Sequence, residues 1–326
     1  MCDSTAALLS MIAPLVTIYL GFPMLFLGFV GNLLTLLVFL SLETFRQSSC
    51  AFYLTMASFI NTFHLFTGLL TFIVINGIGD SWLNASLIYC KFRQYFTQVC
   101  IMTSMSCMCL ATIDQFLATQ SNVRWYRFNN VKLARYIFLG LLLCLVFLLV
   151  PYLIFYNHII SASTGKVVCA ITNAIFSKYN DFAQSLFVLI IIPMFIMTVF
   201  GLLAYRNVQN ISYRTIPLVR RELEKQLTSM VLVQVFYNVP VMTPMLIATF
   251  YNGVAGSTLN ACDRIKMGIT INLCILWYYL FAVGAFYIYI SVSKRFRQQL
   301  IYVLFNMLWE QFRRRFKHNL VEPQKQ

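Results

Sequence analysis

The sequence predicts an all-α membrane protein: a seven-transmembrane-helix bundle followed by a C-terminal amphipathic helix. Of its 326 residues, 60% are hydrophobic and only 10% are charged, and its mean hydropathy is +0.75. Soluble domains carry about 25% charged residues and could not bury this much apolar surface. The apolar residues also fall into seven runs, each long enough for a bilayer crossing of about 20 residues.

Short polar links separate the seven expected spans. The spans cover about residues 15–40, 51–75, 88–118, 133–156, 182–205, 226–249 and 268–291. The first span lacks the basic start and the small-residue cleavage pattern of a signal peptide, so we expect it to be retained. No internal repeat and no Gly-, Ser- or Pro-rich linker divides the chain, and we expect one domain over residues 1–326.

An amphipathic helix is predicted after the seventh span, over about residues 293–316. Its apolar side chains recur at helical spacing near one face: Phe296, Leu300, Val303, Leu304, Met307, Leu308 and Phe312. Such a helix lies in the membrane interface, and the basic residues at its two ends favour the anionic lipid of the inner leaflet. A disordered basic tail is the alternative, which the periodicity disfavours.

The basic residues also predict the orientation of the chain. Most of the 24 Lys and Arg residues lie in the links on the same side as the C-terminal tail. The positive-inside rule then places the N-terminus outside and the C-terminus in the cytoplasm. The net charge of +14 is explained by a surface that faces anionic lipid, without any binding of nucleic acid.

Four of the ten cysteines fall on the outer side in this topology, where disulfides persist. Cys90 starts the third span and Cys169 lies in the loop before the fifth, so a bridge between them would tie that loop over the bundle. Cys2 and Cys262 could form a second bridge or remain free, because spacing does not fix connectivity. Asn84 begins an Asn-Ala-Ser triplet in the first outer loop and is an expected glycosylation site.

These features together resemble the rhodopsin-like (class A) G-protein-coupled receptors, over about residues 15–316. The matching marks are the pair Gly31-Asn32, Cys90 with Cys169, Trp82, the span prolines Pro193 and Pro240, and Tyr289 followed seven residues later by Phe296. The resemblance implies a disulfide between Cys90 and Cys169. It also implies a plasma-membrane receptor that binds an extracellular ligand in the outer half of the bundle and a heterotrimeric G protein at the inner end.

The inner end of the third span departs from the family. The resemblance places the switch that faces the G protein at Asp114, Gln115, Phe116 and Tyr289. Gln115 stands where the family has an Arg, and a neutral hydrogen bond is about half as strong as a charge-assisted one. The alternative is therefore a receptor-fold protein that couples poorly or acts as a decoy. Asp114, without its neighbouring Arg, is expected to pair with a basic residue of the second inner loop, such as Arg124 or Arg127.

Other family positions have also changed. Ser58 replaces the Asp that binds sodium, Ala285-Phe286 replaces Asn-Pro in the seventh span, and Asn238 stands where the sixth span often has Trp. Ser104 matches a third sodium-ligand position, but a hard cation needs several oxygen ligands, usually with one anion among them. We therefore expect no sodium site and no other metal.

The ligand is expected to bind among spans three, five, six and seven. Its polar contacts are predicted to be Gln94, Gln98, Gln184, Asn238, Thr243 and Tyr278. The outer half of the spans holds no acid, which disfavours an amine ligand, and the seventh span has no Lys that could bind retinal. We favour a peptide, acidic or neutral, because basic residues lie at the rim: Lys91, Arg93, Lys166 and Lys178.

Other classes of membrane protein are less favoured. A transporter or channel would place ionisable groups at mid-membrane, but only His64 lies within a span away from its ends. The sequence contains no His/Asp/Glu cluster at metal-ligand spacing, no Ser–His pair placed for catalysis and no phosphate-binding Gly loop. We therefore expect neither an enzyme nor a cofactor.

Overall fold

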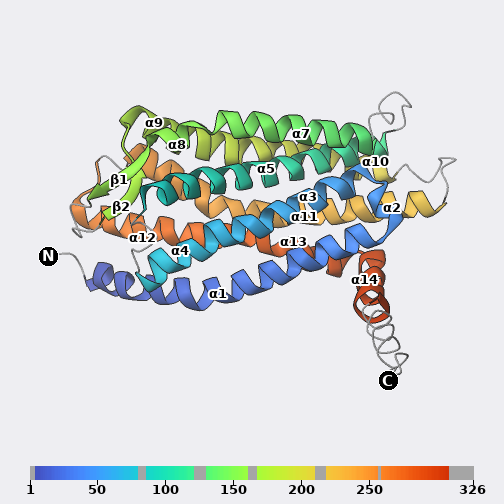
Figure 1. Cartoon of the computed structure of the whole chain (residues 1–326), viewed down its shortest axis with the longest axis horizontal. Helices are drawn as coiled ribbons and strands as arrows, with labels where there is room; N and C mark the ends of the chain where they lie inside the picture. The colour runs from blue at the N-terminus through green and yellow to red at the C-terminus, as the bar shows by residue number, and fades with distance from the viewer. Residues whose placement is uncertain are drawn as a thin grey trace, which may run out of the picture.

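The fold is a bundle of long helices with roughly parallel axes (Figure 1). The structure, a computed structural model, describes residues 4–79, 86–120, 130–160, 167–209, 218–255 and 258–307. Seven helices in this part of the chain are long and apolar enough to cross a membrane, which confirms the predicted fold class. They cover Leu8–Ser41, Ser49–Ile78, Leu87–Thr119, Val131–Phe155, Ala174–Val208, Glu222–Ala255 and Cys262–Val292.

The helices of the second and third spans begin with polar caps. Ser48 and Ser86 cap the second and third spans by accepting hydrogen bonds from the backbone N–H groups of Ala51 and Tyr89. The second span is partly π-helical, which changes the direction of its side chains toward the end of the span. The elements are α1 (Ser4–Ser41), α2 (Glu43–Arg46), α3 (Ser49–His64), η1 (Leu65–Leu70), α4 (Thr71–Ile73), η2 (Val74–Ile78) and α5 (Leu87–Thr119).

A β-hairpin that the sequence analysis missed connects spans four and five. Strands β1 (Tyr156–Ile160) and β2 (Val167–Ile171) pair antiparallel, with Tyr156 opposite Ile171. The fourth span therefore ends at Phe155 instead of Tyr156. The flanking elements are α7 (Val131–Leu148), α8 (Pro151–Phe155), α9 (Ala174–Lys178), η4 (Tyr179–Ile191) and α10 (Ile192–Gln209).

Spans six and seven contact each other at a proline kink. Span six is α11 (Leu218–Ala255), which contains Pro240 and Pro244, and span seven consists of α12 (Ala261–Tyr278) and α13 (Leu280–Val292). Pro244 has no N–H to donate to the carbonyl of Pro240. The indole nitrogen of Trp277 donates to that carbonyl instead, at 3.4 Å.

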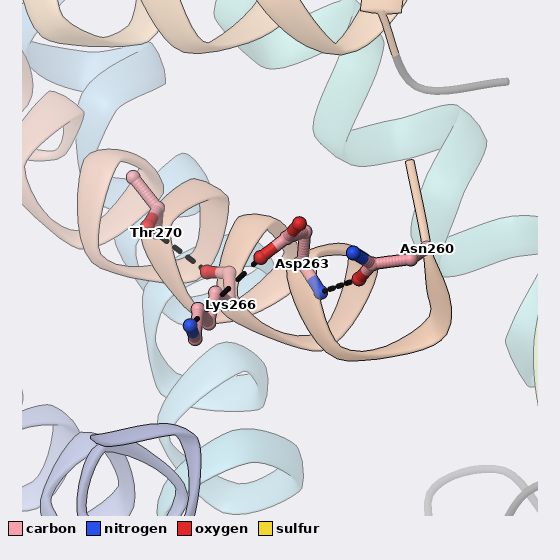
Figure 2. Close-up of polar contacts among 4 residues, drawn as sticks. All are labelled: Asn260, Asp263, Lys266 and Thr270. Carbon is pink, nitrogen blue, oxygen red and sulfur yellow. Dashed lines mark hydrogen bonds and ion pairs between the residues drawn. The ribbon is translucent and has the colours of Figure 1, made fainter. Parts of the chain in front are cut away.

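The start of α12 is stabilised by local polar contacts (Figure 2). Asn260 accepts a hydrogen bond of 2.9 Å from the backbone N–H of Asp263, as an N-cap residue does. The carboxylate of Asp263 also lies 3.8 Å from the ammonium of Lys266. These contacts fix the first turn of the seventh span at the end of the bundle that carries β1 and β2, which we call the hairpin end.

The predicted amphipathic helix begins at Lys294, as α14 (Lys294–Ile301), and continues as η6 (Tyr302–Met307). It leaves the bundle at the end opposite the hairpin and turns away from it (Figure 1). Phe296, Leu300 and Val303 pack against the bundle, while Ile301 and Phe305 are exposed. Residues 308–316 of the prediction lie outside the described residues.

The disulfide between Cys90 and Cys169 is confirmed, with 5.8 Å between the two Cα atoms. It joins the start of α5 to β2 and so holds the hairpin on the bundle. Cys262 is a free thiol. Its predicted partner Cys2 lies outside the described residues, as do Trp82 and the predicted glycosylation site Asn84.

Candidate functional site

Gln115 joins three spans at the end of the bundle opposite the hairpin, which we call the Gln115 end. Its side chain is 1% exposed. The amide Oε1 accepts a hydrogen bond of 2.6 Å from the hydroxyl of Thr228 on α11, and that hydroxyl also lies 2.8 Å from the carbonyl of Glu224. The same side chain hydrogen-bonds to Cys50 on α3. A neutral polar contact therefore connects the third span to the second and the sixth.

Asp114 lies against the start of the second span. Its carboxylate accepts hydrogen bonds from the side chain of Ser49 and the backbone N–H of Cys50, the first two residues of α3. The free N–H groups and the dipole of a helix N-terminus favour a negative charge. The helix end therefore provides part of the stabilisation that was expected from a basic residue. The expected partners, Arg124 and Arg127, lie outside the described residues.

A second carboxylate lies near Asp114. Glu224 of α11 is buried and repels Asp114 electrostatically. Neither Glu224 nor Thr228 was identified from the sequence, because their partners on α5 are more than a hundred residues away in the chain. Their spacing of four residues places both on one face of α11, which is the one sequence signal that could have grouped them.

The side chain of Phe116 does not take part in the polar contacts of Asp114 and Gln115. Its ring packs against Phe200 of α10, with 5.3 Å between ring centroids. It lines a groove of about 440 Å³ together with Ile113, Leu133 and Ile137. Of the three consecutive residues that stand at the family motif, only Asp114 and Gln115 form polar contacts with other spans.

Tyr289 lies at the same end in an aromatic cluster. Its buried ring is 5.8 Å from that of Phe296 and 5.9 Å from that of Phe39, measured between centroids. It is also close enough to Cys50 for an electrostatic interaction. Tyr289 therefore connects the seventh span to α1, α14 and the neighbourhood of Gln115.

A second contact of the sixth span involves Gln226, which the sequence analysis also missed. Its Oε1 accepts hydrogen bonds from the hydroxyl of Ser293 at 2.8 Å and from the backbone N–H of Arg295 at 3.0 Å. These donors lie at the turn between α13 and α14. Thr228 and Gln226 thus bind one end of α11 to the third span and to the end of the seventh.

The predicted ligand contacts are mostly buried inside the bundle. The side chains of Gln184, Asn238 and Tyr278 are buried, and Gln94 and Gln98 are half-buried. Among the described residues, Gln98 Oε1, Asn238 Oδ1 and the Tyr278 hydroxyl have no hydrogen-bond partner. An unpaired buried polar group costs about 1–3 kcal/mol, so a bound polar ligand could recover this energy.

Thr243 is not placed with these residues. It lines a groove of about 560 Å³ between α11 and α12, together with Pro244, Tyr251 and Thr270. Its hydroxyl donates to the carbonyl of Val239 in its own helix at 2.7 Å. The sequence analysis placed it with Asn238 among the ligand contacts, but Asn238 is buried in the bundle, whereas Thr243 lines this groove.

Arg93, which we placed at the rim, turns into the bundle instead. Its guanidinium is half-buried and donates to the hydroxyl of Thr71 at 3.2 Å. Tyr89, Tyr156 and Tyr279 lie close enough to interact with its charge. This environment depends on the hairpin and on the π-helical turns of the second span, neither of which was predicted.

The middle of the bundle contains neutral polar contacts. Ser104 donates to the side-chain oxygen of Asn61 at 2.6 Å, so its hydroxyl is already engaged where the family has a sodium ligand. Asn32 donates to the carbonyls of Gly28 and Ala282, which joins spans one and seven. Within the described part of the chain, no group of three or more His, Cys, Asp or Glu side chains could hold a metal ion.

Comparison with known proteins agrees with this arrangement. A family model described as "7 transmembrane receptor (rhodopsin family)" matches residues 31–298, which is most of the chain. The match begins in α1 and ends in α14, so it includes the Gln115 end, the disulfide and the hairpin. A search of curated proteins finds no match to the chain.

Proposed function

The chain belongs to the rhodopsin family of seven-transmembrane receptors, and we propose that it transmits an extracellular ligand signal to a heterotrimeric G protein. The family is one of multi-pass plasma-membrane proteins. We place the hairpin end outside the cell and the Gln115 end in the cytoplasm. This orientation is supported by the distribution of basic residues and by the disulfide at the hairpin end. The apolar exposed residues of α14 would then enter the inner leaflet.

The observation that carries this proposal is the hydrogen bond between Gln115 and Thr228. It joins the inner ends of the third and sixth spans, between which a G protein would have to insert. A ligand that binds better when these ends are apart shifts the receptor toward that state. Because the bond is neutral, breaking it costs less than breaking an ion pair in the same buried place.

We propose a peptide as the ligand class. The partly unpaired polar groups of Gln98, Asn238 and Tyr278 are spread over spans three, six and seven. A ligand that reaches all three must be extended and must carry several hydrogen-bonding groups, as a peptide backbone does. Rim residues Lys91 and Lys178 favour a peptide without excess positive charge.

A second candidate is a receptor that couples poorly or acts as a decoy. It is favoured by Gln115 itself, because a neutral amide brings no charge of its own to a contact with the G protein. Both candidates bind a ligand at the same site. They differ in whether the inner end then activates a G protein.

The experiment that separates these candidates is G-protein activation in cells by the wild type and by Gln115→Arg. Surface expression is checked with an N-terminal tag, and a pooled peptide library serves as agonist. A response of the wild type supports the coupling receptor. A response of Gln115→Arg alone supports the poor coupler, since only the restored Arg then activates the G protein.

A further inference from the structure

We propose that Arg93 is the anchor for a carboxylate of the ligand. This inference rests on the proposed receptor function, and it specifies the chemistry that the ligand must carry. Arg93 lies one helical turn after Cys90, at the start of α5, where the hairpin covers the bundle.

The disulfide positions the surroundings of Arg93. Cys169 of β2 is bonded to Cys90, and β2 in turn pairs with β1 so that Tyr156 lies opposite Ile171. Tyr156 is thereby held near the guanidinium, with which it interacts electrostatically. The hairpin thus supplies one wall of the site as well as its cover.

The opposite wall is formed by spans two and seven. Tyr279 lies at the break between α12 and α13, and its ring is 5.1 Å from that of His64 and 6.2 Å from that of Phe72. Its hydroxyl fits against Gly68, where an added Cβ would lie only 2.6 Å from the oxygen. Tyr279 is therefore fixed in place, with its hydroxyl on the side of the second span.

Hydroxyl groups surround the guanidinium. Thr71 already accepts one of its N–H groups at 3.2 Å, and Tyr89, Tyr156 and Tyr279 provide phenols. Phenol hydroxyls can donate to an anion, and the guanidinium fork matches the two oxygens of a carboxylate. The phenol hydroxyls come from α5, from β1 and from the break between α12 and α13, and each could donate to a bound carboxylate.

The charge of Arg93 is not neutralised by the described carboxylates. Asp181 accepts a hydrogen bond from Asn180, and Asp263 pairs with Lys266 (Figure 2). No described carboxylate forms an ion pair with Arg93. A half-buried cation without a counter-ion is costly, and Arg is the side chain best suited to bidentate binding of a carboxylate. A ligand carboxylate would therefore find a partner that the protein already holds in place.

The test uses the purified full chain in nanodiscs, with 4-phenylbutyrate as the probe and its neutral amide as the matched compound. Binding is measured by the rise in unfolding temperature over a concentration series. We expect the acid to stabilise the wild type at concentrations where the amide does not. We expect Arg93→Gln to weaken binding of the acid at least about tenfold, since a hydrogen bond to a charged group contributes about 1.5–3 kcal/mol.

Two further variants make the result specific. Arg93→Lys keeps the charge without the fork and should retain part of the response to the acid. Arg264→Gln removes an exposed charge at the same end of the bundle and should respond as the wild type does. Without probe, Arg93→Gln should unfold close to the wild-type temperature, because no described carboxylate forms an ion pair with Arg93.

Three outcomes would overturn the inference: equal stabilisation by acid and amide, an unchanged response in Arg93→Gln, or no response of the wild type to the acid. A large fall in the unfolding temperature of Arg93→Gln without probe would assign Arg93 a structural role instead. No G protein is present in this experiment. Binding through Arg93 can therefore be confirmed or rejected independently of whether the receptor couples.

Discussion

The hydrogen bond of Gln115 determines how strongly the third and sixth spans are held together at the Gln115 end. A neutral hydrogen bond contributes a net of about 0.5–1.5 kcal/mol, against about 1.5–3 kcal/mol when one partner is charged. The contact with Thr228 therefore holds the third and sixth spans together more weakly than an ion pair would. We infer that this receptor separates the two spans at a lower cost.

Removal of the Thr228 hydroxyl tests the strength of this contact. Thr228→Val keeps the shape of the side chain but leaves the amide oxygen of Gln115 buried without its donor. The free energy of unfolding should fall by about 1–3 kcal/mol, the cost of an unsatisfied buried acceptor. Thermal unfolding of the purified protein measures this loss.

Thr112→Val is the matched control. Thr112 is also fully buried, but its hydroxyl bonds back to Met108 in its own helix. An equal loss of stability in the two variants would mean that the contact between spans stabilises the protein no more than a hydroxyl that bonds within its own helix.

The residues proposed for the switch could be named from the sequence, but their partners could not. Asp114, Gln115 and Tyr289 could be placed by their spacing and their resemblance to the family. Thr228, Ser49 and Gln226 could not, because each becomes a partner only when distant helices pack. The inward turn of Arg93 was missed for the same reason, since a charge near a span end is usually solvated.

At the scale of elements, the hairpin depends on the disulfide for its attachment. Cys169→Ser should lower the free energy of unfolding by about 2–4 kcal/mol, which is typical for the loss of a native disulfide. Thermal unfolding with and without reductant measures the effect. The reductant should lower the unfolding temperature of the wild type and leave that of the variant unchanged.

The control for this substitution is Cys144→Ser, since Cys144 is an exposed free thiol. It should unfold as the wild type does and respond to reductant in the same way. If reductant destabilised Cys169→Ser as well, the effect would come from the free thiols and not from the bridge.

Spans six and seven pack closely at Gly284. The ring of Tyr237 lies where a side chain of residue 284 would be, since an added Cβ would be 2.5 Å from three of its atoms. The hydroxyl of Tyr237 then reaches the carbonyl of Leu280 at 3.0 Å. Gly284→Ala should therefore displace Tyr237 and lower the free energy of unfolding by about 1–3 kcal/mol, as overpacking does.

Gly268→Ala is the control in the same span, because nothing lies within 4 Å of its added Cβ. There, the higher helix propensity of Ala should raise stability by about 0.5–1 kcal/mol. Thermal unfolding of both variants should give changes of opposite sign. Destabilisation by both would mean that span seven tolerates no substitution of Gly, whatever the local space.

The elements themselves were largely predictable from hydropathy. All seven spans were found, because a run of about 20 apolar residues rarely forms anything other than a membrane-spanning helix. The hairpin was missed although two β-branched runs flank a polar segment, a pattern that is typical of hairpins. The break of the seventh span at Tyr279 has no sequence signal, since the surrounding residues are as apolar as the rest of the span.

The whole molecule has two ends with different polar chemistry. At the hairpin end, Arg93 has capacity to bind a ligand, and so have the buried polar atoms of Asn238 and Tyr278 within the bundle. At the other end, Gln115 and Gln226 are engaged with donors from other elements. This arrangement fits the proposed ligand site toward the hairpin and the proposed contact of the third and sixth spans at the Gln115 end.

Guanine-nucleotide exchange tests the central claim most directly. The wild type, Thr228→Val and Thr112→Val are reconstituted in nanodiscs with purified heterotrimeric G proteins, and basal exchange is measured without ligand. We predict faster exchange with Thr228→Val than with the wild type or Thr112→Val, by about fivefold if about 1 kcal/mol of inner-end stability is lost. Exchange by all three at the rate of empty nanodiscs would contradict the claim that this receptor couples through the contact of Gln115 with Thr228.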